Sequence, residues 1–566
     1  MVGLLAAAGI MAATLLVGLR GVAAVRTTSD FLVASRRTSP LVNSSAVAGE
    51  YLSAGSFVGA AGLMVKDGVG SLWYLVGFAA GYVTMLVLVA APMRRSGALT
   101  VPDFAEARLG SAGLRRLSAV VVLVISTLYL VPQFRAAGLV LSVVSPVPYW
   151  VGIVLAAGAV SITLALGGMR AATYVQAFQF VLKMVLFAIP AIWLVVAVGA
   201  AVRTQALHPV EFDRFPRETT LVFRDRVTVE TAAPVRVDGE LLAPGTHSFH
   251  GGQRVIFPAG TPTPRVGALE PPGGTAWQRP LFDIGHHGYP LFSTLAVLFA
   301  TALGTMGLPH MIMRFHTSPD GRAARRTAAL TIPLIGLFYL FPAIYGALGG
   351  VLVPQLYLSG DTDTVVVALP SQVDSGWQGT LFTGLLTAGC FAAIMTSSLG
   401  LLLAGASAIS HDLGAGGLGR LRLSVLGSAA AVLLLSLPAA RLDAGILVTW
   451  AFTVAASTFS PLLVLSIWWS RLTAFGALAG ILVGLLVSST AIGVTVGVPN
   501  LSGWAAVLAN QPAPLSVPAA FLTMTVVSLR GRPTPWALSA MLRLHVDEND
   551  RSSRTSGRSR TVRRRR

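Results

Sequence analysis

A series of about thirteen apolar stretches, each roughly 20 residues long, constrains the fold of this chain more than any other feature. A helix of about 20 apolar residues is long enough to cross the hydrocarbon core of a bilayer. The predicted spans lie near residues 1–20, 40–64, 71–93, 116–143, 148–167, 171–201, 289–314, 327–353, 379–410, 422–440, 443–469, 473–494 and 511–530. The composition agrees, because 11% of the residues are charged, whereas a soluble domain carries about 25%. We therefore predict an all-α polytopic membrane protein.

Basic residues are concentrated in alternate loops. The chain has 41 Lys and Arg against 23 Asp and Glu, a net charge of +18. Cytoplasmic loops of membrane proteins carry an excess of Lys and Arg. One set of loops holds most of these residues, including Arg314 at the end of the seventh span, whereas the short loops between them hold only Lys66 and Arg441. This pattern predicts a multi-pass protein of the cell membrane with its N-terminus outside and its C-terminus in the cytoplasm.

Residues 531–566 form a Ser- and Arg-rich tail that we expect to be disordered. An arginine near an anionic membrane surface contributes about 1 kcal/mol to attraction. The expected partner of the tail is therefore anionic lipid of the bilayer, and not nucleic acid. No obligate protein partner is inferred.

The one sizeable polar insertion is segment 202–288. It contains alternating stretches such as Leu221–Val229, followed by turns rich in Pro and Gly. We predict a small extracellular β-rich element of two to four strands. A tolerated surface insertion is favoured over a lid or a partner-binding module.

Three consecutive hydroxyl residues, Thr396, Ser397 and Ser398, lie inside the ninth predicted span. Polar groups at membrane depth are costly unless a partner helix, water or an ion satisfies them. Hydroxyl oxygens suit a hard cation such as Na⁺. The alternative is that these hydroxyls donate to the carbonyls four residues earlier, as many membrane Ser and Thr do.

Two spans contain residues that interrupt a helix. The second span includes Gly49–Ser56, and the seventh includes Gly304–His310, in which two glycines precede Pro309. Proline removes a backbone donor and glycine weakens a helix, so both segments are expected to unwind. The breaks are five spans apart, and an odd-numbered repeat inserts its second copy upside down. This spacing predicts two inverted repeats whose broken helices face the centre of the bundle.

Three ionisable residues lie at apparent membrane depth: Glu50, Arg135 and Lys183. Each costs on the order of 3 kcal/mol unless it is paired or hydrated. Arg135 could bind a carboxylate, pair with Glu50, or extend toward an interface. Lys183 continues a polar stripe with Gln176 and Gln179, which either lines a cavity or packs against another helix.

Five motifs resemble the sodium/solute symporter family: DFLVASRR (30–37), YLSAGSF (51–57), GGMRA (167–171), GLPHMIMRF (307–315) and LAGASAISHDL (403–413). Within that family they are most similar to the cation/acetate (monocarboxylate) permeases. The resemblance covers about residues 28–201 and 289–530. It implies the LeuT-type five-plus-five inverted repeat, formed here by the second to sixth and the seventh to eleventh spans.

The resemblance also implies a shared Na⁺ site between the first broken helix and the ninth span. The matching residues are the carbonyls of Gly49, Leu52 and Ala393 and the side chains of Thr396 and Ser397. Ser398 is extra and is assigned to helix packing. Na⁺ is the expected coupling ion, with H⁺ as the alternative. An ion shifts the transporter between its states only by its differential affinity for them.

A substrate is expected between the two broken helices. The candidate residues are Glu50, Tyr51, Ser53, Gln133, Arg135, Gln176, Lys183, Thr305 and Gly307. The acetate-type pattern has an apolar residue at position 135, so Arg135 departs from the resemblance.

These inferences predict a secondary active transporter that couples Na⁺ to a small monocarboxylate such as acetate or pyruvate. The alternatives are the same fold carrying an amino acid, vitamin or other polar solute, or a membrane sensor. The sequence contains no enzymatic motif, catalytic residue or transition-metal site, and its single cysteine excludes a disulfide framework. The expected division is 1–27 (first peripheral span and loop), 28–201 (first repeat), 202–288 (insertion), 289–470 (second repeat), 471–530 (two peripheral spans) and 531–566 (tail).

Overall fold

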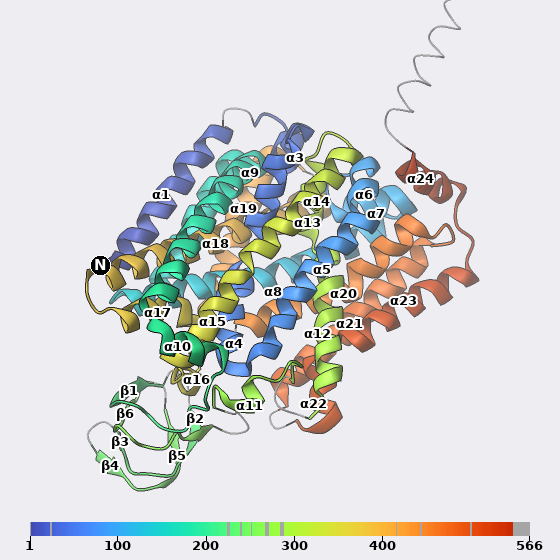
Figure 1. Cartoon of the computed structure of the whole chain (residues 1–566). Coiled ribbons are helices and arrows are strands. Elements are labelled where there is room, and N and C mark those ends of the chain that lie inside the picture. Colours follow the sequence, from blue (N-terminus) through green and yellow to red (C-terminus); the bar gives the residue numbers. More distant parts are fainter. Residues whose placement is uncertain are drawn as a thin grey trace, which may run out of the picture.

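The computed structural model describes residues 2–546 except 23–24, 224–226, 238–239, 251, 267–270, 284–287, 415, 442–443 and 499–500. Figure 1 shows a bundle of long helices with a small group of β-strands at one end. The prediction that the tail, residues 531–566, is disordered is wrong for its first part: helix α24 (Pro535–His545) packs against the bundle because Ala537 and Leu544 are buried there. Residues 547–566 lie outside the described part of the chain.

In the described part of the chain, 11 helices are long and apolar enough to cross a membrane. One of them, α9 (Tyr149–Ala197), is 49 residues long and contains two of the predicted spans. The other predicted spans correspond to α1 (Val2–Val22), α3 (Pro40–Tyr51) with α4 (Ala60–Asp67), α5 (Trp73–Leu88), α8 (Ala112–Val144), α12 (Pro290–Gly307) with α13 (Pro309–His316), α14 (Gly321–Phe338) with α15 (Leu340–Leu352), α18 (Trp377–Ser407), α19 (Leu418–Ser436), α20 (Ala444–Trp468), α21 (Ala474–Gly497) and α23 (Ala513–Arg530).

Shorter helices connect or cover these spans. They are α2 (Thr28–Val33), α6 (Ala90–Ser96), α7 (Val101–Leu109), α10 (Gly199–Leu207), α11 (Gly274–Trp277), α16 (Leu356–Ser359), α17 (Val365–Val373), α22 (Gly503–Asn510) and α24 (Pro535–His545). The α24 helix lies at the end of the bundle opposite the strands (Figure 1).

The two spans within α9 meet at a kink at Gly168. This residue has a φ of 52° inside an otherwise helical segment. A Cβ added there would lie 2.7 Å from the carbonyl oxygen of Phe31. A residue without a side chain is therefore required both by the left-handed backbone and by the close approach of α2.

Both predicted helix breaks are present. The α3 helix ends at Tyr51, and the chain resumes as a π-helical turn, η2 (Gly55–Gly59), that leads into α4. The α12 helix ends at Gly307, and Leu308 adopts an extended conformation before Pro309 begins α13. Proline is favoured at the first position of a helix because its missing N–H is not needed there.

The broken helices occupy equivalent places in two repeats, α3 to α9 and α12 to α20. The first broken helix packs through α3 against α9 and α18, and the second packs through α12 against α5 and α20. Glycines allow these close contacts: a Cβ at Gly304 or Gly307 would lie about 2.5 Å from a backbone oxygen of α20. The fold is the LeuT-type five-plus-five inverted repeat, with α1, α21 and α23 at its periphery.

The insertion is β-rich, as predicted, but it contains more strands than expected. Seven strands are described: β1 (Thr219–Val222), β2 (Val227–Thr231), β3 (Val235–Val237), β4 (Glu240–Leu242), β5 (Gly245–Phe249), β6 (Arg254–Phe257) and β7 (Arg265–Val266). They form two antiparallel sheets with the orders β1-β6-β3-β4 and β5-β2-β7. The prediction of two to four strands missed the shortest ones, which have only two or three residues and show little alternation.

The segment after the strands is attached to the bundle. The Trp277 side chain is buried, and its indole N–H donates to the carbonyl oxygen of Val65 in α4 at 3.2 Å. The Trp73 indole, at the start of α5, donates to the carbonyl oxygen of Pro280 at 2.7 Å. The insertion therefore contacts the half of the first broken helix that follows the break.

Candidate functional site

Three of the oxygen atoms predicted to bind a cation surround one nitrogen atom, the Nζ of Lys183. Nζ lies 2.6 Å from the carbonyl oxygen of Gly49, 3.0 Å from that of Leu52 and 3.0 Å from Oγ1 of Thr396. The Lys183 side chain is fully buried. Its ammonium thus connects α9 with the break after α3 and with α18.

The break itself makes these carbonyls available. In a continuous helix, the N–H of Ser53 would donate to Gly49 and that of Ser56 to Leu52. Here the Ser53 N–H donates to the Tyr51 carbonyl and to the Ser56 hydroxyl, whereas the Ser56 N–H donates to the Ser53 hydroxyl. Unwinding at Leu52 and Ser53 therefore leaves two main-chain oxygens for the Lys183 ammonium.

The remaining predicted cation ligands lie beside this group. Thr396 Oγ1 is 2.9 Å from the carbonyl oxygen of Ala393, and the Ser397 hydroxyl donates to the carbonyl of Glu50 at 2.5 Å. Ser398 donates back to the carbonyl of Ile394 at 2.7 Å, the helix-internal bond expected for a packing hydroxyl. The structure brings the predicted ligands together, and the binding of an ion to them stays a prediction.

The partner of Glu50 is Arg314. The Arg314 Nε lies 2.5 Å from Glu50 Oε2, and both side chains are buried. Arg314 also donates to the Thr173 hydroxyl at 2.9 Å and to the Gln176 side-chain oxygen. The Gln176 amide nitrogen in turn donates to the carbonyl of Thr396 at 2.6 Å. A buried ion pair with such hydrogen-bonded support links α13, α3, α9 and α18.

Two expectations about charged residues are therefore wrong. The arginine distribution groups Arg314 with the cytoplasmic loops, but it lies inside the bundle, because the chain turns helical again at Pro309 and continues to His316. The interpretation of Arg135 as the partner of Glu50 also fails. Arg135 pairs with Asp363 at 2.8 Å, in the turn η5 (Thr362–Thr364) that packs on α4.

The other predicted substrate residues line the two breaks. The hydroxyls of Tyr51 and Thr305 are 2.6 Å apart and join the broken helices. The Ser53 hydroxyl is 3.1 Å from that of Tyr129, and the Gln133 side chain accepts a bond from the N–H of Ala54 at 3.1 Å. Gly307 contributes no side chain; it allows close contact with α20.

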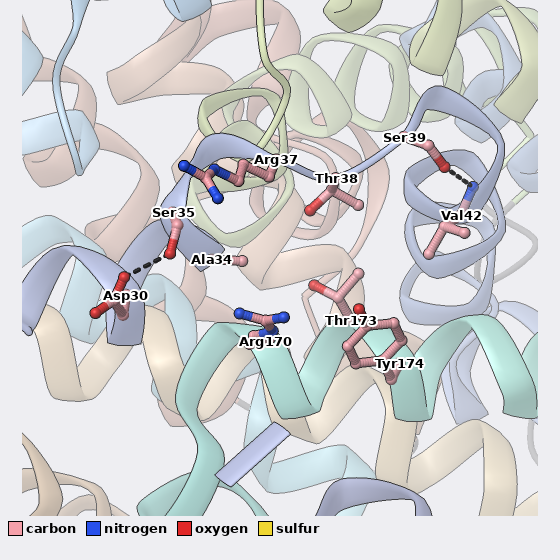
Figure 2. A pocket seen from close by; sticks show the side chains of 10 residues that line it. All are labelled: Asp30, Ala34, Ser35, Arg37, Thr38, Ser39, Val42, Arg170, Thr173 and Tyr174. Carbon is pink, nitrogen blue, oxygen red and sulfur yellow. Dashed lines mark hydrogen bonds between the residues drawn. The ribbon is translucent and has the colours of Figure 1, made fainter. Parts of the chain in front are cut away.

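A cavity of about 510 Å³ lies beside the N-terminal end of α3 and the kink in α9 (Figure 2). Thr173 lines this cavity and also accepts the hydrogen bond from Arg314. Thr173 therefore lies between the cavity and the buried ion pair, which does not itself line the cavity. Its lining residues are Asp30, Ala34, Ser35, Arg37, Thr38, Ser39, Val42, Arg170, Thr173 and Tyr174.

The cavity lining carries two arginines, Arg37 and Arg170, and one carboxylate. Hydrogen bonds from the hydroxyls of Ser35 and Thr27 lower the pKa of Asp30 to about 2. The Asp30 carboxylate is therefore ionised at neutral pH, and these three charged side chains leave an excess of one positive charge.

A helical bundle in which two interrupted helices meet through polar groups at its centre defines the class of the protein: a secondary transporter with the LeuT-type fold. The model of the sodium:solute symporter family matches residues 31–234 and 283–484. The chain therefore belongs to the sodium:solute symporter family.

Comparison with known proteins agrees with this assignment. An uncharacterized symporter of Bacillus subtilis strain 168, YwcA, is 27% identical over 509 residues, which cover 87% of this chain and 86% of that protein. A solved Na⁺-coupled sialic acid symporter, in a substrate-bound outward-open state, is similar with a TM-score of 0.67, 13% identity and coverage of 94% and 98% of the two chains. Mhp1, a nucleobase-cation-symport-1 family transporter in a closed conformation, has a TM-score of 0.51, 14% identity and coverage of 92% and 99%.

These comparisons establish the family and the fold, and the family's name supports Na⁺ as the coupling ion. Both solved structures are of transporters, not enzymes. The similarity to the acetate branch stays a prediction.

Proposed function

We propose that this protein carries a small monocarboxylate, such as acetate or pyruvate, into the cell together with a cation. The proposal that the substrate is an anion rests mainly on the balance of buried acidic and basic side chains at the centre of the bundle. Glu50 is paired with Arg314 and Arg135 with Asp363, whereas Lys183 contacts only neutral oxygens among the described residues. A buried positive charge without a carboxylate partner favours an anionic solute nearby.

Arg135 is the proposed contact for the solute carboxylate. Its side chain is buried, and its Nε has no hydrogen-bond partner in the described part of the chain. A buried donor without a partner costs free energy that an incoming carboxylate oxygen would recover. Tyr51 and Thr305 would complete the site, because their hydroxyls join the two breaks and would separate as a solute enters.

The proposed path runs from the insertion side to the cavity of Figure 2. The Arg135–Asp363 pair lies by α4, and the cavity lies at the opposite end of the same broken helix, beside the start of α3. Transport by alternating access would open one end while the other is closed. The excess positive charge of the cavity lining would also attract an anion.

Na⁺ is the proposed driving ion, supported by the family and by the Na⁺ coupling of the similar sialic acid symporter. Purified protein in liposomes should accumulate labelled acetate or pyruvate above the external concentration when an inward Na⁺ gradient is imposed. The same vesicles without a gradient, and protein-free vesicles, are the controls. Uptake that responds neither to a Na⁺ nor to a pH gradient would contradict symport, and Na⁺-driven uptake of proline without acetate would contradict the proposed substrate.

A further inference from the structure

The arrangement around Lys183 has the donor number and geometry of a bound cation. An ammonium group has three N–H donors and no acceptor. Three acceptors lie within hydrogen-bond distance of Nζ, at 2.6 to 3.0 Å. Gly49 belongs to the last turn of α3, Leu52 to the break that follows it, and Thr396 to α18. Each N–H of the ammonium therefore has one acceptor.

The same three oxygens belong to the predicted Na⁺ site. A Na⁺ ion bound by Gly49, Leu52 and Thr396 would have to lie where the Lys183 nitrogen already is. The side chain is buried, so water does not screen one positive charge from another. The ion and the ammonium cannot share this set of oxygens.

We infer that the ammonium of Lys183 is a tethered cation that takes the place of Na⁺ between α3 and α18, so that this site binds no Na⁺ in the native protein. The inference rests on the proposed function only in that it concerns the ion sites of a symporter. Because Lys183 is covalently part of α9, its charge holds the two helices together but is not released into the cytoplasm. Any Na⁺ that is transported with the solute binds elsewhere.

Binding of ²²Na⁺ to purified protein without solute tests this inference independently of transport. Lys183→Ala vacates the oxygens, and Lys183→Met removes the charge but fills the space. We expect Lys183→Ala to gain one Na⁺ equivalent relative to the native protein and Lys183→Met to gain none. Na⁺ should also raise the Tm of Lys183→Ala by at least about 3 °C more than that of the native protein.

A second substitution tests where the additional Na⁺ binds in the Lys183→Ala variant. Ser397 and Ser398 are neighbours on α18, but only Ser397 belongs to the predicted ligands, since its hydroxyl bonds to Glu50 and that of Ser398 bonds within the helix. In the Lys183→Ala background, Ser397→Ala should weaken ²²Na⁺ binding at least 10-fold, whereas Ser398→Ala, the matched control, should leave it unchanged.

The same two serine substitutions in protein that retains Lys183 test the inference even if the Lys183→Ala variant does not fold. With Lys183 present, neither Ser397→Ala nor Ser398→Ala should change ²²Na⁺ binding. Loss of Na⁺ binding in Ser397→Ala but not in Ser398→Ala would overturn the inference, as would folded Lys183→Ala protein that gains no Na⁺.

Discussion

At the scale of single residues, the centre of this protein is arranged around one lysine. Two unit charges 4 Å apart repel each other by about 4 kcal/mol at an effective dielectric constant of 20. The oxygens of Gly49, Leu52 and Thr396 therefore accommodate one positive charge at a time, and Lys183 supplies it.

The substitution Arg135→Lys should separate the two proposed roles of Arg135. The new ammonium would keep a positive charge opposite Asp363, which lies 2.8 Å from an arginine nitrogen in the native protein, but it would lack the Nε donor that has no partner among the described residues. Loss of one charge-assisted hydrogen bond to the solute is worth about 1.5–3 kcal/mol. We expect the KM for acetate to rise at least about 10-fold, while the Tm changes little; an unchanged KM would remove Arg135 from the substrate site.

At the scale of helices, close packing fixes how the broken helix meets its neighbours. A Cβ at Gly49 would lie 2.4 Å from the backbone oxygen of Gln176 in α9. A Cβ at Gly400 in α18 would lie against the Glu50 carboxylate. Small residues at such positions let the backbones approach and bring Lys183 within reach of the break.

Substituting alanine for Gly49 should push α3 away from α9. Overpacking of this kind costs about 1–3 kcal/mol, and it would also displace the carbonyl that Lys183 contacts. We expect a lower Tm in detergent and lower uptake. Gly158→Ala is the matched control in α9, because a Cβ there meets nothing within 4 Å; its Tm should be equal or higher. Equal stability of the two variants would contradict the close contact.

The sequence predicted the elements better than their partners. The apolar runs located the spans, and Pro309 and the glycines around it located a break, because both signals are local. The Thr396–Ser397 pair was predicted to face the first break, and the Ser397 hydroxyl does donate to the carbonyl of Glu50 there; cation binding by the pair stays a prediction. The pairing of Lys183 with oxygens more than 130 residues away depends on how three helices rotate and pack, which no local pattern reveals.

The same limit explains the error at Arg314. Hydropathy ends the seventh span near this residue and so predicts a loop, although the helix continues beyond the break and carries Arg314 into the bundle. A buried carboxylate at Glu50 was the one available signal, since it needs a cationic partner. Only the three-dimensional structure shows that Arg314, and not Arg135, is the partner of Glu50.

At the scale of the whole molecule, the insertion and the α24 helix lie at opposite ends of the bundle (Figure 1). The arginine distribution predicts that the insertion is outside and α24 is in the cytoplasm. Cys390 is fully buried, so it gives little background in labelling with thiol reagents.

Single cysteines test this orientation in intact cells. Thr246→Cys lies on an exposed position of β5, and Ser539→Cys lies on an exposed position of α24. A membrane-impermeant maleimide should label Thr246→Cys in intact cells and Ser539→Cys only after permeabilisation, with the native protein as the control. The reverse pattern would invert the proposed topology.

The central claim is that this member of the sodium:solute symporter family moves a small carboxylate through the space between its broken helices. Counterflow in proteoliposomes tests it most directly, because exchange needs the solute site but no ion gradient. Vesicles preloaded with unlabelled acetate or pyruvate should transiently accumulate the labelled solute from outside, at a rate well above that of protein-free vesicles. Equal rates for loaded protein-containing vesicles and protein-free vesicles, with every small monocarboxylate tested, would contradict the account.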